Sequence, residues 1–338
     1  THSAGIGSYR EALARFYTER GLPLTAEQII VTTGGSEAIL MGMLATCDQG
    51  DQIIVPEPYY ANYNGFATEA GVEIVPVRSL IEEDFALPPI AEFEKLITPK
   101  TRGILICNPN NPTGYLYSEE EILQLREIVL RHDLFLMADE VYSDFCYDGA
   151  RHHSVLALEG MDDHVIMMDS ISKRFSMCGA RIGALASRNP AVIDAALRMG
   201  QARLCAPYVE QVAAEAALRA PKSYFEQVHD EYKTRRNFMI EALNRMPGVR
   251  CPKPRGAFYA IAELPVDDAD RFARWMLEEF QHNGHTVMVA PASGFYARPE
   301  TGRHQVRLAY VLNIDDLRGA METLALALQA YPGRTTPR

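Results

Sequence analysis

The sequence predicts an α/β fold, in which a mostly parallel (mixed) sheet is flanked by helices and a smaller α+β domain follows at the C-terminal end. Short runs rich in isoleucine and valine alternate with amphipathic stretches, an order typical of parallel sheets. The 338 residues are enough for two domains of about 150 residues each. Hydrophobic residues make up 47% of the chain and charged residues 23%, as in ordinary globular proteins.

We expect seven strands in the first part of the chain, because seven short runs are apolar on both faces. These runs are residues 28–32, 52–55, 72–77, 103–107, 134–138, 165–168 and 182–186. Covering helices are expected over 37–46, after Tyr60 and over 118–131, where apolar residues recur with helical spacing. A further helix is expected to begin at Ser8, because Glu11 follows it three residues later as in a capping box.

The second part of the chain changes character. Residues 190–246 have a helical pattern, and Met246-Pro247-Gly248 is a clear stop signal. We therefore predict a large domain over residues 1–248 and a small domain over 249–338. In the small domain we expect strands at 257–263, 286–290 and 305–310, and helices at 267–281 and 315–330.

Charge and cysteine content argue against several classes of protein. Lys and Arg number 33 against 44 Asp and Glu, a net charge of −11 that does not suit nucleic acid as a partner. No apolar run approaches the roughly 20 residues needed to span a bilayer, so no membrane partner is expected. The six cysteines are scattered and form no C-x-x-C pair, which predicts neither a metal site nor disulfides and favours a cytoplasmic location.

Polar residues follow three of the predicted strands at the point where each strand ends. The loop 108–114, with two prolines and a glycine, follows strand 103–107, and Asp139 with Tyr142 follows strand 134–138. Ser170, Ser172 and Lys173 follow strand 165–168. Because the carboxyl ends of parallel strands meet at one edge of a sheet, an amide, a carboxylate and an amine are predicted to lie close together.

This set of groups has a chemical interpretation. Pyridoxal phosphate needs a lysine for its aldehyde, an acid for its pyridine nitrogen and donors for its phosphate. The turn Gly34-Gly35-Ser36-Glu37 ahead of a helix adds backbone N–H groups and a positive helix end, which suit a phosphate. The sequence therefore predicts a pyridoxal phosphate site.

Eight stretches, in order along nearly the whole chain, resemble the fold-type I aminotransferases of class I/II, the aspartate aminotransferase superfamily. They are Thr33-Gly34-Gly35-Ser36-Glu37-Ala38, Pro58-Tyr59-Tyr60, residues 108–114, Ala138-Asp139-Glu140-Val141-Tyr142, Ser170-Ile171-Ser172-Lys173, Gly179-Ala180-Arg181-Ile182-Gly183, Pro254-Arg255-Gly256-Ala257-Phe258-Tyr259 and Val306-Arg307-Leu308. The resemblance implies a pyridoxal-phosphate-dependent transferase fold and a homodimer. It also implies ping-pong transfer of an amino group from an L-amino acid to a 2-oxo acid.

The resemblance assigns roles to eleven residues. Lys173 would form the Schiff base and move the proton at the substrate Cα. Asp139 would pair with the pyridinium nitrogen, and Asn111 and Tyr142 would donate to the phenolate oxygen, while Tyr60 stacks on the ring. The phosphate would be held by Gly35, Ser36, Ser170, Ser172 and Arg181. Arg307 would bind the substrate α-carboxylate as a bidentate fork, and Asn111 would also bind the substrate.

Two positions depart from the family pattern. Ser36 stands where some aspartate-specific relatives have a lysine, and Ala180 stands where a tryptophan is common. Aspartate and 2-oxoglutarate are favoured as the commonest substrates among relatives, with aromatic, alanine or other amino acids as alternatives. A C–S lyase or a decarboxylase on the same scaffold and a non-catalytic ligand-sensing domain are further alternatives. Relatives carry an N-terminal arm that would precede Thr1.

Several other side chains have ordinary structural interpretations. Arg307 would otherwise form a structural salt bridge, and Tyr63 is expected to be a packing residue. His152 and His153 are expected to be exposed in a loop. His282 and His285 are expected to mark a helix end rather than bind a metal ion, because Asn283 and Gly284 separate them.

Overall fold

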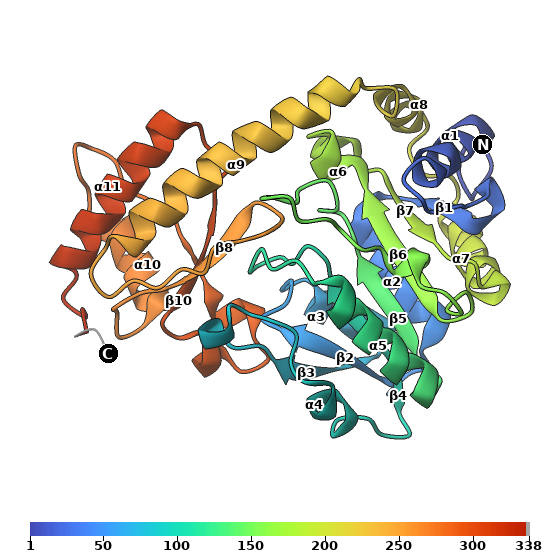
Figure 1. Cartoon of the computed structure of the whole chain (residues 1–338), viewed down its shortest axis with the longest axis horizontal. Coiled ribbons are helices and arrows are strands. Elements are labelled where there is room, and N and C mark those ends of the chain that lie inside the picture. The colour runs from blue at the N-terminus through green and yellow to red at the C-terminus, as the bar shows by residue number, and fades with distance from the viewer. Residues whose placement is uncertain (336–338) are drawn as a thin grey trace.

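A seven-stranded sheet forms the larger of two lobes in the computed structural model, which describes residues 1–335 (Figure 1). The strand order is β1-β7-β6-β5-β4-β2-β3. Only β7 runs antiparallel to its neighbours in this sheet, so the expected mostly parallel sheet is confirmed. The strands are β1 Ile29–Thr32, β2 Gln52–Glu57, β3 Glu73–Arg78, β4 Thr101–Cys107, β5 Phe135–Asp139, β6 Val165–Ser170 and β7 Gly183–Ala186.

Helices cover both faces of this sheet, because its strands alternate apolar side chains between two buried cores. On β4, Leu105 and Cys107 join one core, whereas Ile104 and Ile106 join the other. The first core is covered by α2 (Gly34–Thr46), α3 (Tyr63–Ala70) and α7 (Pro190–Arg203). The second is covered by α1 (Gly7–Thr18), α4 (Ile90–Glu94), α5 (Glu119–His132) and α8 (Tyr208–Ala217). Figure 1 shows α5 in front of the sheet and α2 behind it.

Helix caps follow the sequence in one place and depart from it in another. Ser118 caps α5, accepting from the Glu121 backbone N–H in a complete capping box. The capping box expected at Ser8 is wrong, because α1 begins at Gly7 and Ser8 already lies inside its first turn. The Ser8 hydroxyl instead donates to the Glu215 carboxylate of α8, 2.7 Å away. A tertiary contact has therefore replaced the local cap.

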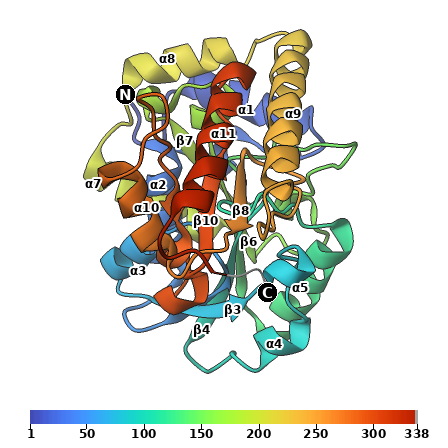
Figure 2. The same cartoon turned by 90° about the vertical axis from the view of Figure 1, so that its left-hand side faces the viewer.

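The smaller lobe is built on an antiparallel sheet of β8 (Tyr259–Glu263), β10 (Gln305–Ala309) and β9 (Ala290–Pro291). Two helices cover it, α10 (Ala269–Glu278) and α11 (Ile314–Ala330). The long α9 (Lys222–Asn244) reaches it from the larger lobe and packs beside α11 (Figures 1 and 2).

Two expectations in the smaller lobe are wrong in detail. The strand expected over 286–290 pairs with β10 only at Ala290 and Pro291. The helix expected to reach residue 281 ends at Glu278, and His282 and His285 face each other across a tight turn with paired backbone hydrogen bonds. Residues 1–335 contain no cluster of histidine, cysteine and carboxylate side chains suited to a metal ion. The domain boundary at residue 248 stays a prediction.

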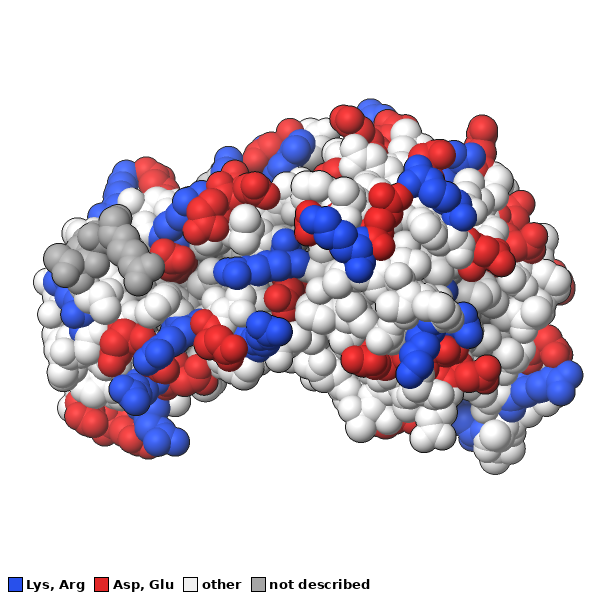
Figure 3. All heavy atoms as spheres, turned by 90° about the horizontal axis from the view of Figure 1, so that it is seen from below, with Lys and Arg blue, Asp and Glu red and all other residues white. Residues whose placement is uncertain are grey.

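The surface between the lobes is hollowed (Figure 3). Basic and acidic side chains are interspersed over the face that Figure 3 shows. In the described part of the chain, no helix is both long enough and apolar enough to cross a membrane.

Candidate active site

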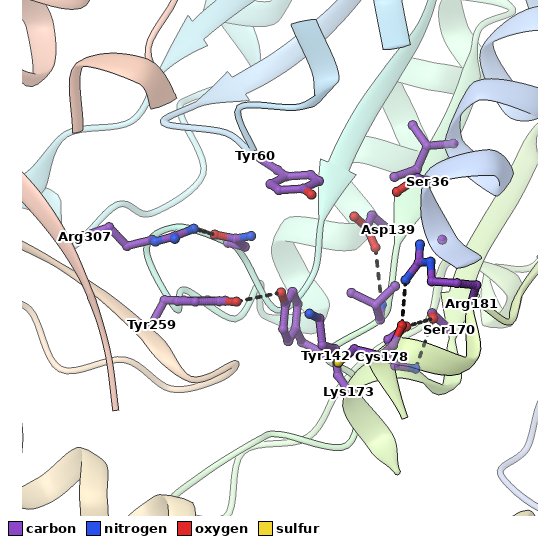
Figure 4. A pocket seen from close by; sticks show the side chains of 15 residues that line it. Ser36, Tyr60, Asp139, Tyr142, Ser170, Lys173, Cys178, Arg181, Tyr259 and Arg307 are labelled. Atoms are coloured by element: carbon purple, nitrogen blue, oxygen red, sulfur yellow. Dashed lines mark hydrogen bonds between the residues drawn. The ribbon is translucent and has the colours of Figure 1, made fainter. Parts of the chain in front are cut away.

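A cavity of about 330 Å³ opens where β4, β5 and β6 end, between the two lobes (Figure 4). All eleven residues singled out from the sequence line it: Gly35, Ser36, Tyr60, Asn111, Asp139, Tyr142, Ser170, Ser172, Lys173, Arg181 and Arg307. The other lining residues are Ile39, Val141, Cys178 and Tyr259. We call this the front cavity. Figure 4 shows Arg307 at one end and Arg181 with Ser170 at the other, with Asp139, Tyr142 and Lys173 between them.

Asp139 lies at the floor of the front cavity, at the last position of β5. Its carboxylate accepts from the Tyr63 hydroxyl at 2.9 Å and from the Val141 backbone N–H at 3.4 Å. Burial raises the pKa of Asp139 to about 6, and the nearby Lys173 charge acts in the opposite direction. Tyr63 is fully buried as expected, but its role as a packing residue does not predict its hydrogen bond to Asp139. Its position three residues after Tyr60, at the start of α3, is the available signal.

Lys173 is held at the cavity wall by the short helix α6 (Ile171–Arg174). Ser170 caps this helix, its hydroxyl accepting from the Ser172 backbone N–H at 3.1 Å. The Lys173 Nζ atom lies 6.0 Å from the centre of the Tyr142 ring. Within residues 1–335 Lys173 forms no salt bridge, so its amine is available to a ligand.

Arg181 and the start of α2 form the opposite end of the cavity. Gly34 has a φ of +76°, and a Cβ atom there would lie 2.4 Å from Arg181 Nη2, so only glycine leaves the guanidinium its place. Arg181 donates to the Cys178 carbonyl at 3.0 Å and has no carboxylate partner in the described chain. Next to it, Gly35 and Ser36 lie in the first turn of the 13-residue α2. A guanidinium beside a helix N-terminus suits an anion.

Arg307 projects from β10 into the other end of the cavity. Its guanidinium carbon lies 4.6 Å from the ring centre of Tyr259 and 4.9 Å from that of Phe295. It donates to Asn111 Oδ1 at 3.1 Å. The structural salt bridge considered as an alternative is absent among residues 1–335, so the guanidinium keeps its capacity to bind a carboxylate.

The donor set of the front cavity fits pyridoxal phosphate. The unpaired Arg181 guanidinium, seated where Gly34 lacks a side chain, offers a phosphate site at one end. The buried carboxylate of Asp139 suits a ring cation in the middle of the cavity. The free amine of Lys173 suits an aldehyde, and Arg307 remains for a second anion.

A second cavity of about 320 Å³, here called the rear cavity, lies across β5 and β6 from the front one. Successive residues at the strand ends divide between the two cavities. Asp139 lines the front and Glu140 the rear, and Ser170 lines the front while Asp169 lines the rear. In α6, Lys173 lines the front and Arg174 the rear.

The cations of the rear cavity are ion-paired. Arg174 is 3% exposed and pairs with Asp169 at 2.8 Å and with Asp144. Arg20 pairs with Asp144 at 2.9 Å. The Tyr17 hydroxyl donates to Asp169 at 2.7 Å, which ties α1 to the end of β6.

The expectation that His152 and His153 are exposed is wrong. The His152 side chain is 12% exposed and its Nε2 atom, 3.6 Å from Glu140 Oε2, has no hydrogen-bond partner among residues 1–335. Burial lowers the pKa of His152 to about 4 and raises the pKa of Glu140 to about 8. His153 is half-buried and also lines the rear cavity. The loop folds back onto the end of β5, which local sequence does not reveal.

The mixed seven-stranded sheet, with a lysine-bearing cavity at its carboxyl edge, defines the class of fold-type I transferases. Within that class, the chain belongs to the family described as aminotransferase class I and II, whose family model matches residues 1–324. The chain is therefore a transaminase of the aspartate aminotransferase superfamily.

Named relatives differ in their substrates. The chain is 34% identical to a putative aminotransferase, YugH, of Bacillus subtilis, over 95% of this chain and 81% of the relative. It is 33% identical to aromatic-amino-acid aminotransferase 2 of Thermococcus litoralis, over 96% and 82%. The structure of Thermus thermophilus aspartate aminotransferase with maleate matches with a TM-score of 0.87 and 32% identity, over 97% of this chain and 83% of that one. The aromatic aminotransferase of Pyrococcus horikoshii matches with a TM-score of 0.90 and 31% identity, over 97% and 87%.

Proposed function

We propose that this transaminase uses pyridoxal phosphate to move an amino group from an L-amino acid to a 2-oxo acid in a ping-pong reaction. The observation that carries the proposal is the front cavity itself. It gathers Lys173, Arg181 and Arg307, none of which has a carboxylate partner among residues 1–335, around the buried Asp139. Cations gathered at one cavity without carboxylate partners favour the binding of anionic ligands.

Each end of the cavity binds one anion. Arg181, the hydroxyls of Ser36, Ser170 and Ser172 and the Gly35 backbone N–H bind the phosphate. Arg307 binds the α-carboxylate of the substrate, and Asn111 orients the Arg307 guanidinium through the 3.1 Å hydrogen bond. The reacting atoms are thereby placed between the two anion sites, within reach of Lys173.

The residues in the middle of the cavity control protons. When bound, the cofactor supplies an aldehyde that takes the amino group and a ring that accepts the electrons left when the substrate Cα loses its proton. Asp139 holds the proton on the ring nitrogen, and Tyr63 fixes the carboxylate that does so. Asn111 and Tyr142 donate to the phenolate oxygen, and Tyr60 covers the ring. Lys173 moves the proton to and from Cα, a contribution of about 10² to 10⁴ in rate.

Aspartate with 2-oxoglutarate is the substrate pair we propose first. Its support is that several relatives about 32% identical to the chain are named aspartate aminotransferases. Aromatic amino acids are the second candidate, because Tyr60, Tyr259 and Ile39 give the cavity an apolar wall and a relative of 33% identity is named for them.

A homodimer is also proposed. The end of α7 and the start of α8 expose a run of apolar side chains: Leu204 at 70%, Tyr208 at 54%, Val209 at 72% and Val212 at 47%. Apolar groups gathered in this way favour association. Sedimentation velocity is expected to give twice the chain mass of 37.7 kDa. A cytoplasmic location stays a prediction, in keeping with six cysteines that are all unpaired.

Product analysis tests the proposed reaction. The protein loaded with pyridoxal phosphate is incubated with L-aspartate or L-phenylalanine, with and without 2-oxoglutarate. We expect glutamate and the matching 2-oxo acid only when the acceptor is present. Release of carbon dioxide in the absence of the acceptor would point instead to decarboxylase chemistry, and release of pyruvate and ammonia from an S-substituted L-cysteine would point to a C–S lyase.

A further inference from the structure

Tyr259, the first residue of β8, contacts two functional groups of the front cavity that lie on different lobes. Its ring centre lies 4.6 Å from the guanidinium carbon of Arg307. Its hydroxyl oxygen lies 3.3 Å from the Tyr142 hydroxyl oxygen, and the two rings meet edge to face at 5.7 Å (Figure 4). One side chain thus links the proposed carboxylate site to the proposed donor for the cofactor's phenolate oxygen.

The contact with Arg307 is a cation–π interaction. The guanidinium also lies over the Phe295 ring at 4.9 Å, and its only hydrogen bond to a side chain among residues 1–335 is the one to Asn111. Aromatic rings attract a guanidinium without occupying its N–H groups. Tyr259 and Phe295 therefore hold Arg307 in place while leaving its donors for a carboxylate, which a salt bridge would not do.

The contact with Tyr142 is a hydrogen bond between two hydroxyl groups, so its direction depends on which hydroxyl donates. Burial raises the pKa of Tyr142 well above its ordinary value, and the neighbouring Tyr259 acts in the same direction, so Tyr142 keeps its proton. In the structure Tyr142 donates to Tyr259. A hydroxyl has one hydrogen, so once Tyr142 donates to the phenolate oxygen, the bond between the tyrosines persists only with Tyr259 as the donor.

This reversal has a consequence for the strength of the Tyr142 hydrogen bond. A hydroxyl that accepts a hydrogen bond becomes a better donor, because hydrogen bonds in a chain polarise one another. A stronger hydrogen bond from Tyr142 stabilises the negative charge on the phenolate oxygen. It therefore lowers the proton affinity of the nitrogen that Lys173 would contribute to the bound cofactor.

We propose that Tyr259 is a positioning residue that acts at both ends of the reaction site, its ring holding Arg307 and its hydroxyl strengthening Tyr142 as a donor. The inference rests on the proposed function, because it takes the roles of Arg307 and Tyr142 from there. It goes beyond the proposed function by assigning a role to Tyr259, with one role for the ring and another for the hydroxyl.

Two substitutions separate the ring from the hydroxyl. Tyr259→Phe removes only the hydroxyl, and Tyr259→Leu removes both. In the protein loaded with pyridoxal phosphate, we expect Tyr259→Phe to raise the pH midpoint of the cofactor's visible absorption change by about 0.2 to 0.5 unit. Its KM for the amino acid should stay within about twofold of wild type. Tyr259→Leu should show the same midpoint shift and also raise KM by about three- to tenfold.

Phe295→Leu is the matched control, because it removes the other ring over Arg307 and has no hydroxyl to lose. We expect it to raise KM without moving the midpoint. A general loosening of the site would move both quantities in all three variants.

The outcomes separate this inference from the proposed function. If wild type shows neither cofactor absorption nor acceptor-dependent turnover, the proposed function fails. If wild type behaves as proposed but Tyr259→Phe leaves the midpoint unchanged or lowers it, the role of the hydroxyl is overturned. If Tyr259→Leu leaves KM at the Tyr259→Phe value, the role of the ring is overturned.

Discussion

The front and rear cavities have nearly the same volume, about 330 and 320 Å³, but they differ in the ion pairing of the cations that line them. In the front cavity, Lys173, Arg181 and Arg307 have no carboxylate partner within residues 1–335. In the rear cavity, Arg20 and Arg174 are ion-paired with Asp144 and Asp169. A cation that is already ion-paired within the fold has a structural role, whereas an unpaired cation that lines a cavity is free to bind an anionic ligand.

Backbone geometry produces this division. Successive residues at a strand end point to opposite faces of the sheet, so Asp139 and Glu140 enter different cavities. Lys173 and Arg174, successive residues of the short helix α6, also line different cavities. Two pairs of sequence neighbours therefore allow matched experiments: Asp139 with Glu140, and Lys173 with Arg174. In each pair the same kind of substitution is made once in the front cavity and once in the rear cavity.

Lys173→Met should have the largest effect on activity. We expect turnover with any amino acid to fall by at least about 10² to 10⁴, because the group that moves the proton is lost. The free energy of unfolding should stay within about 0.5 kcal/mol of wild type, since Lys173 has no ionic partner that its removal would leave unpaired. Steady-state kinetics and urea unfolding of the same preparation measure both quantities, and substantial remaining turnover would contradict the role of Lys173.

Arg174→Met, one residue along, should show the reverse pattern. Removal of Arg174 leaves Asp169 buried without a cation, which costs about 3 to 5 kcal/mol of unfolding free energy. Arg174→Lys keeps the charge and should lose less. Urea unfolding measures the difference, and a loss in Arg174→Met no greater than that in Lys173→Met would break the comparison between the cavities.

Asp139→Asn should again affect the front cavity. The amide keeps the size of the side chain but cannot hold the proton on the ring nitrogen as a carboxylate does. We expect the variant to retain pyridoxal phosphate through dialysis and to lose about 10² to 10³ in kcat. An unchanged kcat would show that the buried carboxylate does not support the reaction.

Glu140→Gln, the rear neighbour, should have the smallest effect, seen in the pH dependence of stability. Because the pKa of Glu140 is raised from its ordinary value to about 8, the folded protein holds a proton that the unfolded chain releases above about pH 4.5. Glu140 therefore contributes stability at low pH that is lost as pH rises through about 8. The pKa of His152 is lowered, so its contribution to stability is fully present above its ordinary pKa of 6.5. Above pH 6.5, the remaining change in stability between these two groups therefore comes from Glu140.

Unfolding measured between pH 6.5 and 9 tests this prediction. The free energy of unfolding should fall with pH by at least about 1 kcal/mol more in wild type than in Glu140→Gln. Parallel pH profiles would mean that Glu140 is already ionised at pH 6.5.

Much of this arrangement can be predicted from the amino-acid sequence, because it follows from local order along the chain. The motif residues Lys173, Asp139 and Asn111 lie at or within a few residues of the ends of strands, and the ends of parallel strands meet at one edge of a sheet. The sheet is predictable for a similar reason: its strands are short, apolar and regularly spaced. The seven predicted runs all overlap strands of the observed sheet.

The features that the sequence does not predict depend on contacts between distant segments. Tyr259 lies 117 residues from Tyr142, and Tyr63 lies 76 residues from Asp139. Ser8 binds Glu215 instead of capping its own helix. His152 is buried because its loop packs onto Glu140. No local sequence pattern predicts such pairs, because each pair depends on which elements become neighbours in the folded chain.

A single-turnover experiment tests the central claim most directly. The protein loaded with pyridoxal phosphate is mixed with excess L-aspartate in the absence of a 2-oxo acid, and the visible absorption of the bound cofactor is followed. We predict loss of that absorption with one equivalent of 2-oxo acid formed per site, and full recovery when the remaining aspartate is removed and 2-oxoglutarate is added. Absence of any change with aspartate, aromatic and other amino acids, or continued product formation without the acceptor, would contradict transamination at the front cavity.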